Sequence, residues 1–278
     1  MASNNRTTKA ERREAARAKA QAMREEQERK ERRARLTRRA ILGAGGLAIV
    51  GVGGAMYLDS RGRVRLEGGT IVSEKAGTSG VPGPVLADGS WTFGGSLKPG
   101  SVASDATIVE VFFDYACHFC AYFENLHHKE LKSLVENGDI TLVLRPSKFL
   151  GSDWTNLTMN SIGVVLDKQP DAAFAFHAAL MSLFARIFDT KNTSLATVES
   201  IVSSATQAGV STDVSAEFEA AVNEGRYSSW VTLGTDTLDK YNIKGTPTVL
   251  VAGKQVDLKK VGTENGLTDL IRSGGVKD

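Results

Sequence analysis

The sequence predicts an α/β domain in which a block of helices interrupts a sheet-forming framework, preceded by a single membrane-spanning helix. Three observations carry this prediction. A β-rich run at 106–113 passes directly into a helical pattern, successive helical segments fill residues 153–235, and residues 40–58 contain no charged side chain. The framework reads as β-α-β before the helical block and as β-β-α after it.

Residues 1–39 form a strongly basic arm. They contain 14 Lys and Arg against 6 Asp and Glu, a local net charge of +8, whereas the whole chain of 278 residues has a net charge of +2. The rest of the chain therefore has a net charge of −6. Such an arm can attract nucleic acid or anionic lipid. Beside a membrane segment it is typical of an orientation signal at the inner leaflet, so we expect no nucleic-acid partner.

The uncharged segment 40–58 is 19 residues long. As a helix it would rise about 28 Å, close to the thickness of a bilayer core. The arginines and lysines just before it predict a cytoplasmic arm and an extracytoplasmic body, as in a single-pass protein of the cell membrane. Arg38 and Arg39 also fit a twin-arginine export signal. The route of export and cleavage of the segment stay open, and the Gly- and Ser-containing stretch 59–85 reads as a linker.

The framework before the helical block contains the first half of a sheet. Residues 91–97 read as a short strand and 106–113 as a buried strand. Apolar side chains at helical spacing follow, and Gly138 is a plausible end of that helix. Residues 140–144 read as the next strand, which completes a β-α-β unit with its turn just before the helix.

The helical block and the end of the chain follow the same logic. We expect helices at 154–168, 171–188, 194–208 and 214–233. A strand at 246–251, a hairpin turn at 252–254, a return strand at 254–258 and a terminal helix at 263–273 come after them.

Cys117 and Cys120 are the only cysteines, spaced C-x-x-C at the turn from strand to helix. This spacing is typical of redox exchange or of metal binding. Zinc would need two further ligands, and His127 and His128 lie on the same predicted helix as the cysteines. His177 is isolated, and we expect it on a helix surface. Copper bound by both cysteines and His118 is the stronger metal alternative, but redox exchange is favoured, with no resident metal and no cofactor.

The chemistry of exchange assigns different roles to the two cysteines. A thiolate attacks a disulfide, and a helix start directs unpaired N–H groups and the positive end of the helix dipole at Cys117. Cys117 should therefore be the attacking thiol, with a lowered pKa, and Cys120 the resolving thiol. His118, as imidazolium, would stabilise the thiolate further, whereas Phe119 is expected to pack or to line a substrate groove.

Two stretches carry a resemblance to a known family. FFDYACHFCAYFE at 112–124 resembles the active-site region of the DsbA-like thiol–disulfide oxidoreductases, and GTPTVLV at 245–251 resembles their cis-proline strand. The resemblance implies a thioredoxin fold over 86–278, with a helical insertion at about 153–235. It also implies that Pro247 is cis, that Thr246 faces the Cys117 sulfur, and that substrate polypeptide pairs there.

The chain departs from that family at two positions. Many relatives have C-P-H-C, whereas His118 occupies the first intervening position here. Many also bury an acid six residues before the first cysteine, where this chain has Val111. Glu110 and Asp114 share the other face of the strand, and either is a candidate proton acceptor in its place.

The leading functional hypothesis is an oxidase that introduces disulfides into exported polypeptides with free thiols. The resemblance implies reoxidation by a quinone-linked membrane oxidoreductase of the DsbB or vitamin-K-epoxide-reductase-like kind. A reductase or isomerase using the same atoms, and a copper chaperone using the same cysteines, are the alternatives. Residues 60–90 are too short for an added dimerisation domain, which favours the oxidase and a monomer.

Overall fold

The computed structural model describes residues 49–51, 54–58, 64–66, 71 and 74–274. The chain divides into two compact units, Met1–Leu47 and Ala48–Asp278, and all described residues belong to the second. The predicted basic arm 1–39 and much of the predicted membrane segment 40–58 lie outside the described residues.

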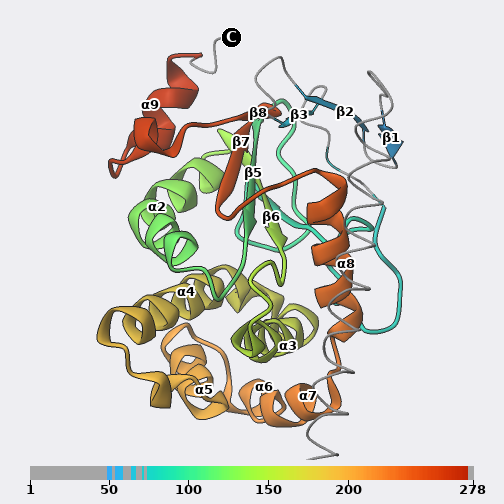
Figure 1. Cartoon of the computed structure of the whole chain (residues 1–278), viewed down its shortest axis with the longest axis vertical. Coiled ribbons are helices and arrows are strands. Elements are labelled where there is room, and N and C mark those ends of the chain that lie inside the picture. The colour runs from blue at the N-terminus through green and yellow to red at the C-terminus, as the bar shows by residue number, and fades with distance from the viewer. Residues whose placement is uncertain (1–48, 52–53, 59–63, 67–70, 72–73, 275–278) are drawn as a thin grey trace, which may run out of the picture. The chain divides into compact units, whose positions relative to one another are not determined.

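The described residues form one mixed sheet of eight strands in the order β1-β2-β3-β8-β7-β5-β6-β4 (Figure 1). The strands are β1 (Ile49–Gly51), β2 (Gly54–Leu58), β3 (Val64–Leu66), β4 (Trp91–Gly94), β5 (Thr107–Phe113), β6 (Ile140–Pro146), β7 (Thr248–Val251) and β8 (Lys254–Gln255). β5 runs parallel to β6 and antiparallel to β7. Its apolar sequence is buried along most of its length, as expected for a central strand. The strands predicted around 91, 106, 140 and 246 are thus confirmed, with shifted ends.

Helices cover both faces of the sheet. They are α2 (His118–Glu136), α3 (Asp153–Lys168), α4 (Ala173–Thr190), α5 (Val198–Gln207), α6 (Thr212–Ser215), α7 (Phe218–Glu224), α8 (Ser228–Lys240) and α9 (Gly266–Arg272). Short 3-10 turns occur at Pro170–Ala172, Thr193–Leu195 and Leu258–Val261. In Figure 1, α2 and α9 lie on one side of the sheet, α8 lies on the other, and α3 to α7 gather at one end.

The helix predicted at 214–233 is wrong as a single element. The structure has three helices there, α6, α7 and α8. Gly225 ends α7 in the left-handed conformation, with φ of 60°, which a glycine adopts without strain. The chain then turns, and α8 continues to Lys240 and packs on β6. Helix α8 therefore covers the sheet and does not extend the helical block.

The structure also differs from the predicted membrane helix 40–58 and from the predicted linker 59–85. Residues 49–51 and 54–58, inside the predicted membrane helix, are strands β1 and β2, which pair with each other. Glycine is a poor helix former, and the six glycines of 40–58 weaken its helix propensity. The predicted linker 59–85 contains strand β3, and its end packs on the domain: Val85 is fully buried, and Trp230 donates its backbone N–H to Gly80.

Among the described helices, one is long and apolar enough to cross a membrane, that of Pro170–Thr190. More than half of its most apolar stretch is buried within the domain, at 56%. It includes α4, which packs against α2, α3 and α5. Its apolar character therefore belongs to the protein core.

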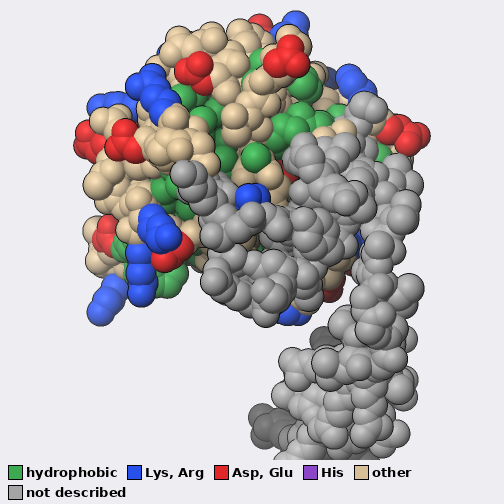
Figure 2. Space-filling model, turned by 90° about the horizontal axis from the view of Figure 1, so that it is seen from above, with side chains coloured by type: hydrophobic (Ala, Val, Ile, Leu, Met, Phe, Trp, Pro, Cys, Tyr) green, Lys and Arg blue, Asp and Glu red, His purple; other side chains and the backbone are tan. Residues whose placement is uncertain are grey.

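The core lies mainly between the sheet and the helices α2, α3 and α4. Large aromatic side chains from the sheet meet others from the helices, as Phe93 meets Phe174 edge-on at 5.0 Å between ring centroids. A smaller cluster on the opposite face of the sheet includes Phe112, Leu238 and Leu250. On the face shown in Figure 2, acidic and basic side chains alternate around a centre with apolar side chains.

Candidate active site

The turn between β5 and α2 is fixed by Asp114. Its carboxylate accepts hydrogen bonds from the backbone N–H of Ala116 at 2.9 Å and of Leu150 at 2.8 Å, and from the hydroxyl of Thr155. Its backbone carbonyl accepts the N–H of Cys117 at 3.0 Å. This fully buried carboxylate holds the turn in place, and its role as a proton acceptor stays a prediction.

Cys117 is the N-cap residue of α2. Its sulfur accepts the backbone N–H of Cys120 at 3.4 Å, as a capping side chain does. Both cysteines are free thiols in this structure. A hydrogen bond from the Cys120 thiol is the largest cause that lowers the pKa of Cys117. Despite burial, this bond, the nearby Thr246 side chain and backbone N–H groups of the helix start together bring the pKa to about 6. Cys117 is therefore largely thiolate at neutral pH.

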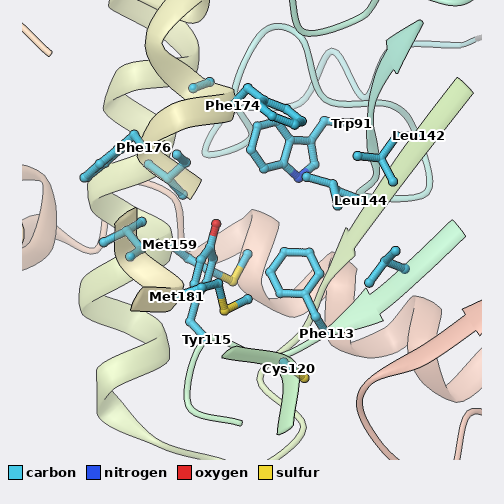
Figure 3. Packing of buried hydrophobic residues seen from close by; sticks show 14 of the residues in the cluster. Trp91, Phe113, Tyr115, Cys120, Leu142, Leu144, Met159, Phe174, Phe176 and Met181 are labelled. Atoms are coloured by element: carbon cyan, nitrogen blue, oxygen red, sulfur yellow. The ribbon is translucent and has the colours of Figure 1, made fainter. Parts of the chain in front are cut away.

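Cys120 has the opposite character. Both side chains are buried, with Cys117 4% and Cys120 2% exposed, and Cys120 lies at the edge of the apolar cluster beside Phe113 and Tyr115 (Figure 3). Burial raises the pKa of Cys120 well above its usual value, and the neighbouring Cys117 sulfur raises it further. The two sulfurs therefore differ in pKa, in the direction expected from the place of Cys117 at the helix start, and hardly differ in exposure.

The loop before β7 faces this pair. The Thr246–Pro247 peptide bond is cis, as the family resemblance implied. The Cys117 thiol donates to the carbonyl of Thr246 at 3.2 Å, so Thr246 does face the Cys117 sulfur. The Thr246 hydroxyl is buried without a partner at ordinary hydrogen-bond distance, and it lowers the pKa of both cysteines. It is placed to donate to whichever sulfur is a thiolate.

His118 has a different environment from the one expected. Its ring stacks on Phe188 of α4, with 4.0 Å between centroids and 2° between ring planes. The groups that lower the pKa of Cys117 are Cys120, the Thr246 side chain and the backbone N–H of Phe119. His118 thus joins the active-site helix to the helical block, and its effect on the thiolate stays a prediction.

An apolar groove of about 360 Å³ lies beside the cysteines. Phe119 is 61% exposed at one edge of this groove, and Thr246 and Pro247 also line it. The remaining lining residues are Tyr122, Phe123, Leu126, His127, Leu258, Val261 and Gly262. The structure thus brings together Phe119, Thr246 and Pro247, the three residues expected to contact substrate.

Glu110 belongs to a buried ion network on the other face of the sheet. Its carboxylate accepts the Nε–H of Arg145 at 2.8 Å, and Arg145 also pairs with Asp88. The Arg145 guanidinium lies 5.3 Å from the ring centre of Phe112 and 4.8 Å from that of Tyr241. Since side chains alternate along β5, Glu110 points away from the face that carries the cysteine pair.

A buried network of polar side chains lies beneath α2, and the sequence patterns did not predict it. The hydroxyl of Tyr115 lies 2.9 Å from Nδ1 of His177, whose Nε2 lies 3.6 Å from a carboxylate oxygen of Glu124. His128 contacts the other oxygen of Glu124 at 2.9 Å. The prediction that His177 is on a helix surface is wrong, because it is 2% exposed.

The sequence nevertheless contains signals for this network of polar side chains. Glu124 is one helical turn after the buried Cys120, so both lie on one side of α2. His177 is flanked by the apolar run AFAF and by two alanines, as in a buried helix. Among the described residues, no group of three or more His, Cys, Asp and Glu side chains is arranged to hold a metal ion.

Comparison with known proteins agrees with this geometry. A family model described as Thioredoxin matches residues 94–271. MdbA, a thiol-disulfide oxidoreductase from Actinomyces oris, is 42% identical, with 72% of this chain and 95% of that chain covered and a TM-score of 0.68. BdbD from Bacillus subtilis is 23% identical, with 70% and 96% covered and a TM-score of 0.54, and shares the fold. No curated protein sequence matches this chain.

Proposed function

Because the chain belongs to the thioredoxin family, among its DsbA-like thiol–disulfide oxidoreductases, we propose that it is an oxidase that introduces disulfides into exported polypeptides. The observation that carries the direction of electron flow is the position of the Cys117 sulfur. It caps α2 and receives hydrogen bonds that lower its pKa to about 6. Stabilising this thiolate stabilises the reduced pair, and a stabilised reduced form makes the disulfide a stronger oxidant.

The oxidation proceeds in two exchanges. A client thiolate attacks the Cys117 sulfur of the Cys117–Cys120 disulfide, which forms a client–Cys117 bond and releases Cys120 as a thiolate that takes up a proton. A second client thiolate then attacks the client sulfur of this mixed disulfide and releases Cys117 as a thiolate. Two electrons pass from the client to the cysteine pair. A quinone-linked membrane oxidoreductase would remove them and restore the disulfide.

The apolar groove and the loop before β7 support the role of substrate binding. Phe119 offers an exposed aromatic surface, and Thr246 and Pro247 lie between the groove and the Cys117 sulfur. An extended client chain that passes over Thr246 would bring its cysteine to Cys117 and an apolar neighbour into the groove. Backbone pairing there would position clients of varied sequence.

The asymmetry of the cysteines argues against copper transport. Soft metals bind thiolates, and a two-cysteine copper site uses both sulfurs. Cys120 is buried and its pKa is raised, so it resists forming the second thiolate. A resolving cysteine, in contrast, needs to ionise only transiently during exchange.

We place the catalytic body outside the cytoplasm, with the basic arm that precedes the uncharged segment 40–58 on the cytoplasmic side. The arginines and lysines before this segment support a cytoplasmic arm. An oxidising compartment would also allow client disulfides to persist. Protease added to intact spheroplasts should then digest the body and spare the arm, and full protection of the body would contradict this topology.

The redox potential of the cysteine pair tests the proposed direction. The full-length protein, equilibrated in glutathione buffers, should have a potential above about −180 mV, in the range of disulfide donors. A value near about −270 mV, typical of a disulfide reductant, would contradict an oxidase and favour the reductase alternative. The oxidised protein should also convert a reduced two-cysteine peptide to its disulfide, with one peptide oxidised per Cys117–Cys120 pair.

A further inference from the structure

A second hollow lies next to the apolar groove and shares two of its residues. It has a volume of about 400 Å³, and Thr246 and Pro247 line both cavities. The two hollows therefore flank the loop that faces the Cys117 sulfur. A client chain passing over Thr246 would place neighbours on one flank of its cysteine over the groove and those on the other flank over this second hollow.

The second hollow offers hydrogen-bond donors and no carboxylate. The side chains of Asn242, Lys244 and Gln255 line it, and no Asp or Glu is among its described lining residues. Lys244 is exposed and has no ionic partner among the described side chains. The hydroxyl of Thr248, also in the lining, already donates to the carbonyl of Gly245 at 2.8 Å. The side-chain amides of Asn242 and Gln255 and the ammonium group of Lys244 are thus available as hydrogen-bond donors to a ligand.

The sequence around the second hollow is basic, although the domain as a whole is acidic. Residues 240–260 contain five lysines and a single acid, Asp257, whereas residues 40–278 together have a net charge of −6. Neither Asp257 nor the neighbouring Asp239 lines the hollow. A local excess of positive charge attracts an anionic group and raises its rate of encounter.

We propose that this second hollow, the acid subsite, binds an acidic side chain of the client polypeptide next to the cysteine under attack, with Lys244 as its charge partner. The proposal rests on the proposed oxidase function and specifies its substrates. Preferred client cysteines have an acidic residue on one flank, over the acid subsite, and an apolar residue on the other, over the groove.

Single-turnover oxidation of peptides by the full-length, disulfide-form protein tests this selectivity. Two-cysteine peptides would carry leucine on one flank of the first cysteine and Glu, Gln or Lys on the other, and a second set would exchange the flanks. In the set that places the variable residue over the acid subsite, the Glu peptide should react about two- to fivefold faster than the Gln peptide. The Lys peptide of that set should react most slowly. The advantage should shrink in high salt, because the pair is exposed to solvent.

Variants connect the preference to the acid subsite. Lys244→Gln should abolish the difference between Glu and Gln peptides, and Lys244→Glu should reverse the order of Glu and Lys peptides. Lys98→Glu makes the same charge change in the stretch after β4, whose last residue pairs with Thr141 near the start of β6. That is the end of the sheet opposite Cys117, so Lys98→Glu should keep the preference.

The outcomes separate this inference from the function on which it rests. Equal rates for Glu and Gln peptides in both sets, with all peptides oxidised, would overturn the acid subsite and leave the oxidase intact. Oxidation of no peptide by the disulfide form would remove the oxidase itself, together with its client preference. A preference for Glu that persists in Lys244→Glu would also overturn the assignment of Lys244.

Discussion

The sulfur of Cys117 lies 3.2 Å from the backbone carbonyl of Thr246, although 129 positions separate the two residues in the chain. The contact joins the start of α2 to the loop before β7, so the attacking sulfur lies where a client chain would pair. When Cys117 ionises, its hydrogen bond to this carbonyl is lost, and the buried Thr246 hydroxyl is available to donate in its place. The loop therefore accommodates both states of the thiol.

The first prediction concerns the ionisation of Cys117. Its thiolate absorbance should rise with a midpoint near pH 6, because a hydrogen bond from Cys120 and the nearby Thr246 side chain lower its pKa. Alkylation by iodoacetamide should therefore slow as the pH falls through 6 and level off above it. Cys120→Ser keeps a donor and should keep a low midpoint, whereas Cys120→Ala should raise it. A midpoint at or above about 8.5 in the wild type would contradict the activation.

The second prediction separates the two cysteines by trapping. Cys120→Ala should accumulate disulfide-linked complexes, because its Cys117 thiolate can still attack the disulfide of an oxidised client, whereas the neighbouring thiol that would release the client is absent. Cys117→Ala should accumulate few, since the pKa of the remaining Cys120 thiol is raised and little of it is thiolate at neutral pH. Gel electrophoresis of each variant, without reductant and again after reduction, measures the amount of disulfide-linked complex. Equal trapping by the two variants, or none by either, would contradict the assigned roles.

The third prediction concerns Glu124. Burial opposes its ionisation, but His177 and His128 lower the pKa of its carboxyl to about 2, below the ordinary 4.5. A lowered folded-state pKa contributes stability that is fully present above about pH 4.5 and is lost as the pH falls towards 2. Glu124→Gln should therefore lower the free energy of unfolding by about 1–3 kcal/mol at pH 7, with a smaller difference from wild type at pH 3.

Glu136 provides the matched control on the same helix. It pairs with Lys132 at 2.9 Å, and both side chains are 45% exposed. Glu136→Gln should change the free energy of unfolding by less than about 0.5 kcal/mol, because exposed pairs of this kind contribute little. Urea unfolding at several pH values measures both variants. Equal effects of the two substitutions would show that the buried contacts of Glu124 do not stabilise the fold.

The active-site turn was predictable because its signals are local. The apolar run of β5, the helical spacing after it and the position of Cys117 between them lie within one short stretch. The placement of Thr246 depended on the family resemblance, since nothing local to residue 246 indicates a contact with Cys117. The predicted helix at 214–233 breaks at Gly225, and the helix-forming residues on both sides of this single glycine hide the break in the sequence.

Long-range polar contacts were the part that sequence patterns did not predict. Arg145 and Asp88 are separated by 57 positions, and each is an ordinary charged residue in its local sequence. An isolated histidine such as His177 predicts a surface position, whereas the packing of its helix on the sheet buries it against Trp91 and Phe113. Such pairings are set by which strands and helices become neighbours, which local periodicity does not specify.

The fourth prediction concerns the ion network on the far face of the sheet. Arg145 is buried between Asp88 and Glu110, and Arg145→Met would leave both acids without their cation. Burial raises the pKa of Glu110 even with Arg145 present, whereas for Asp88 the guanidinium and the hydrogen bonds from Ser90 together outweigh burial and lower the pKa. Removing the cation should lower the free energy of unfolding by about 3–5 kcal/mol at pH 7, because a buried charge then lacks its partner.

Two further measurements identify charge as the cause in that variant. Without the cation, the folded-state pKa values of Asp88 and Glu110 should rise above those of the unfolded chain. The two ionised carboxylates then destabilise the folded state at neutral pH, and protonation removes this effect as the pH falls through the raised pKa values. The loss in free energy of unfolding of Arg145→Met relative to wild type should therefore shrink on acidification. Adding Asp88→Asn and Glu110→Gln to Arg145→Met should recover most of the loss at pH 7. A deficit that neither acid nor the triple variant reduces would instead point to lost packing of the Arg145 side chain against Phe112 and Tyr241.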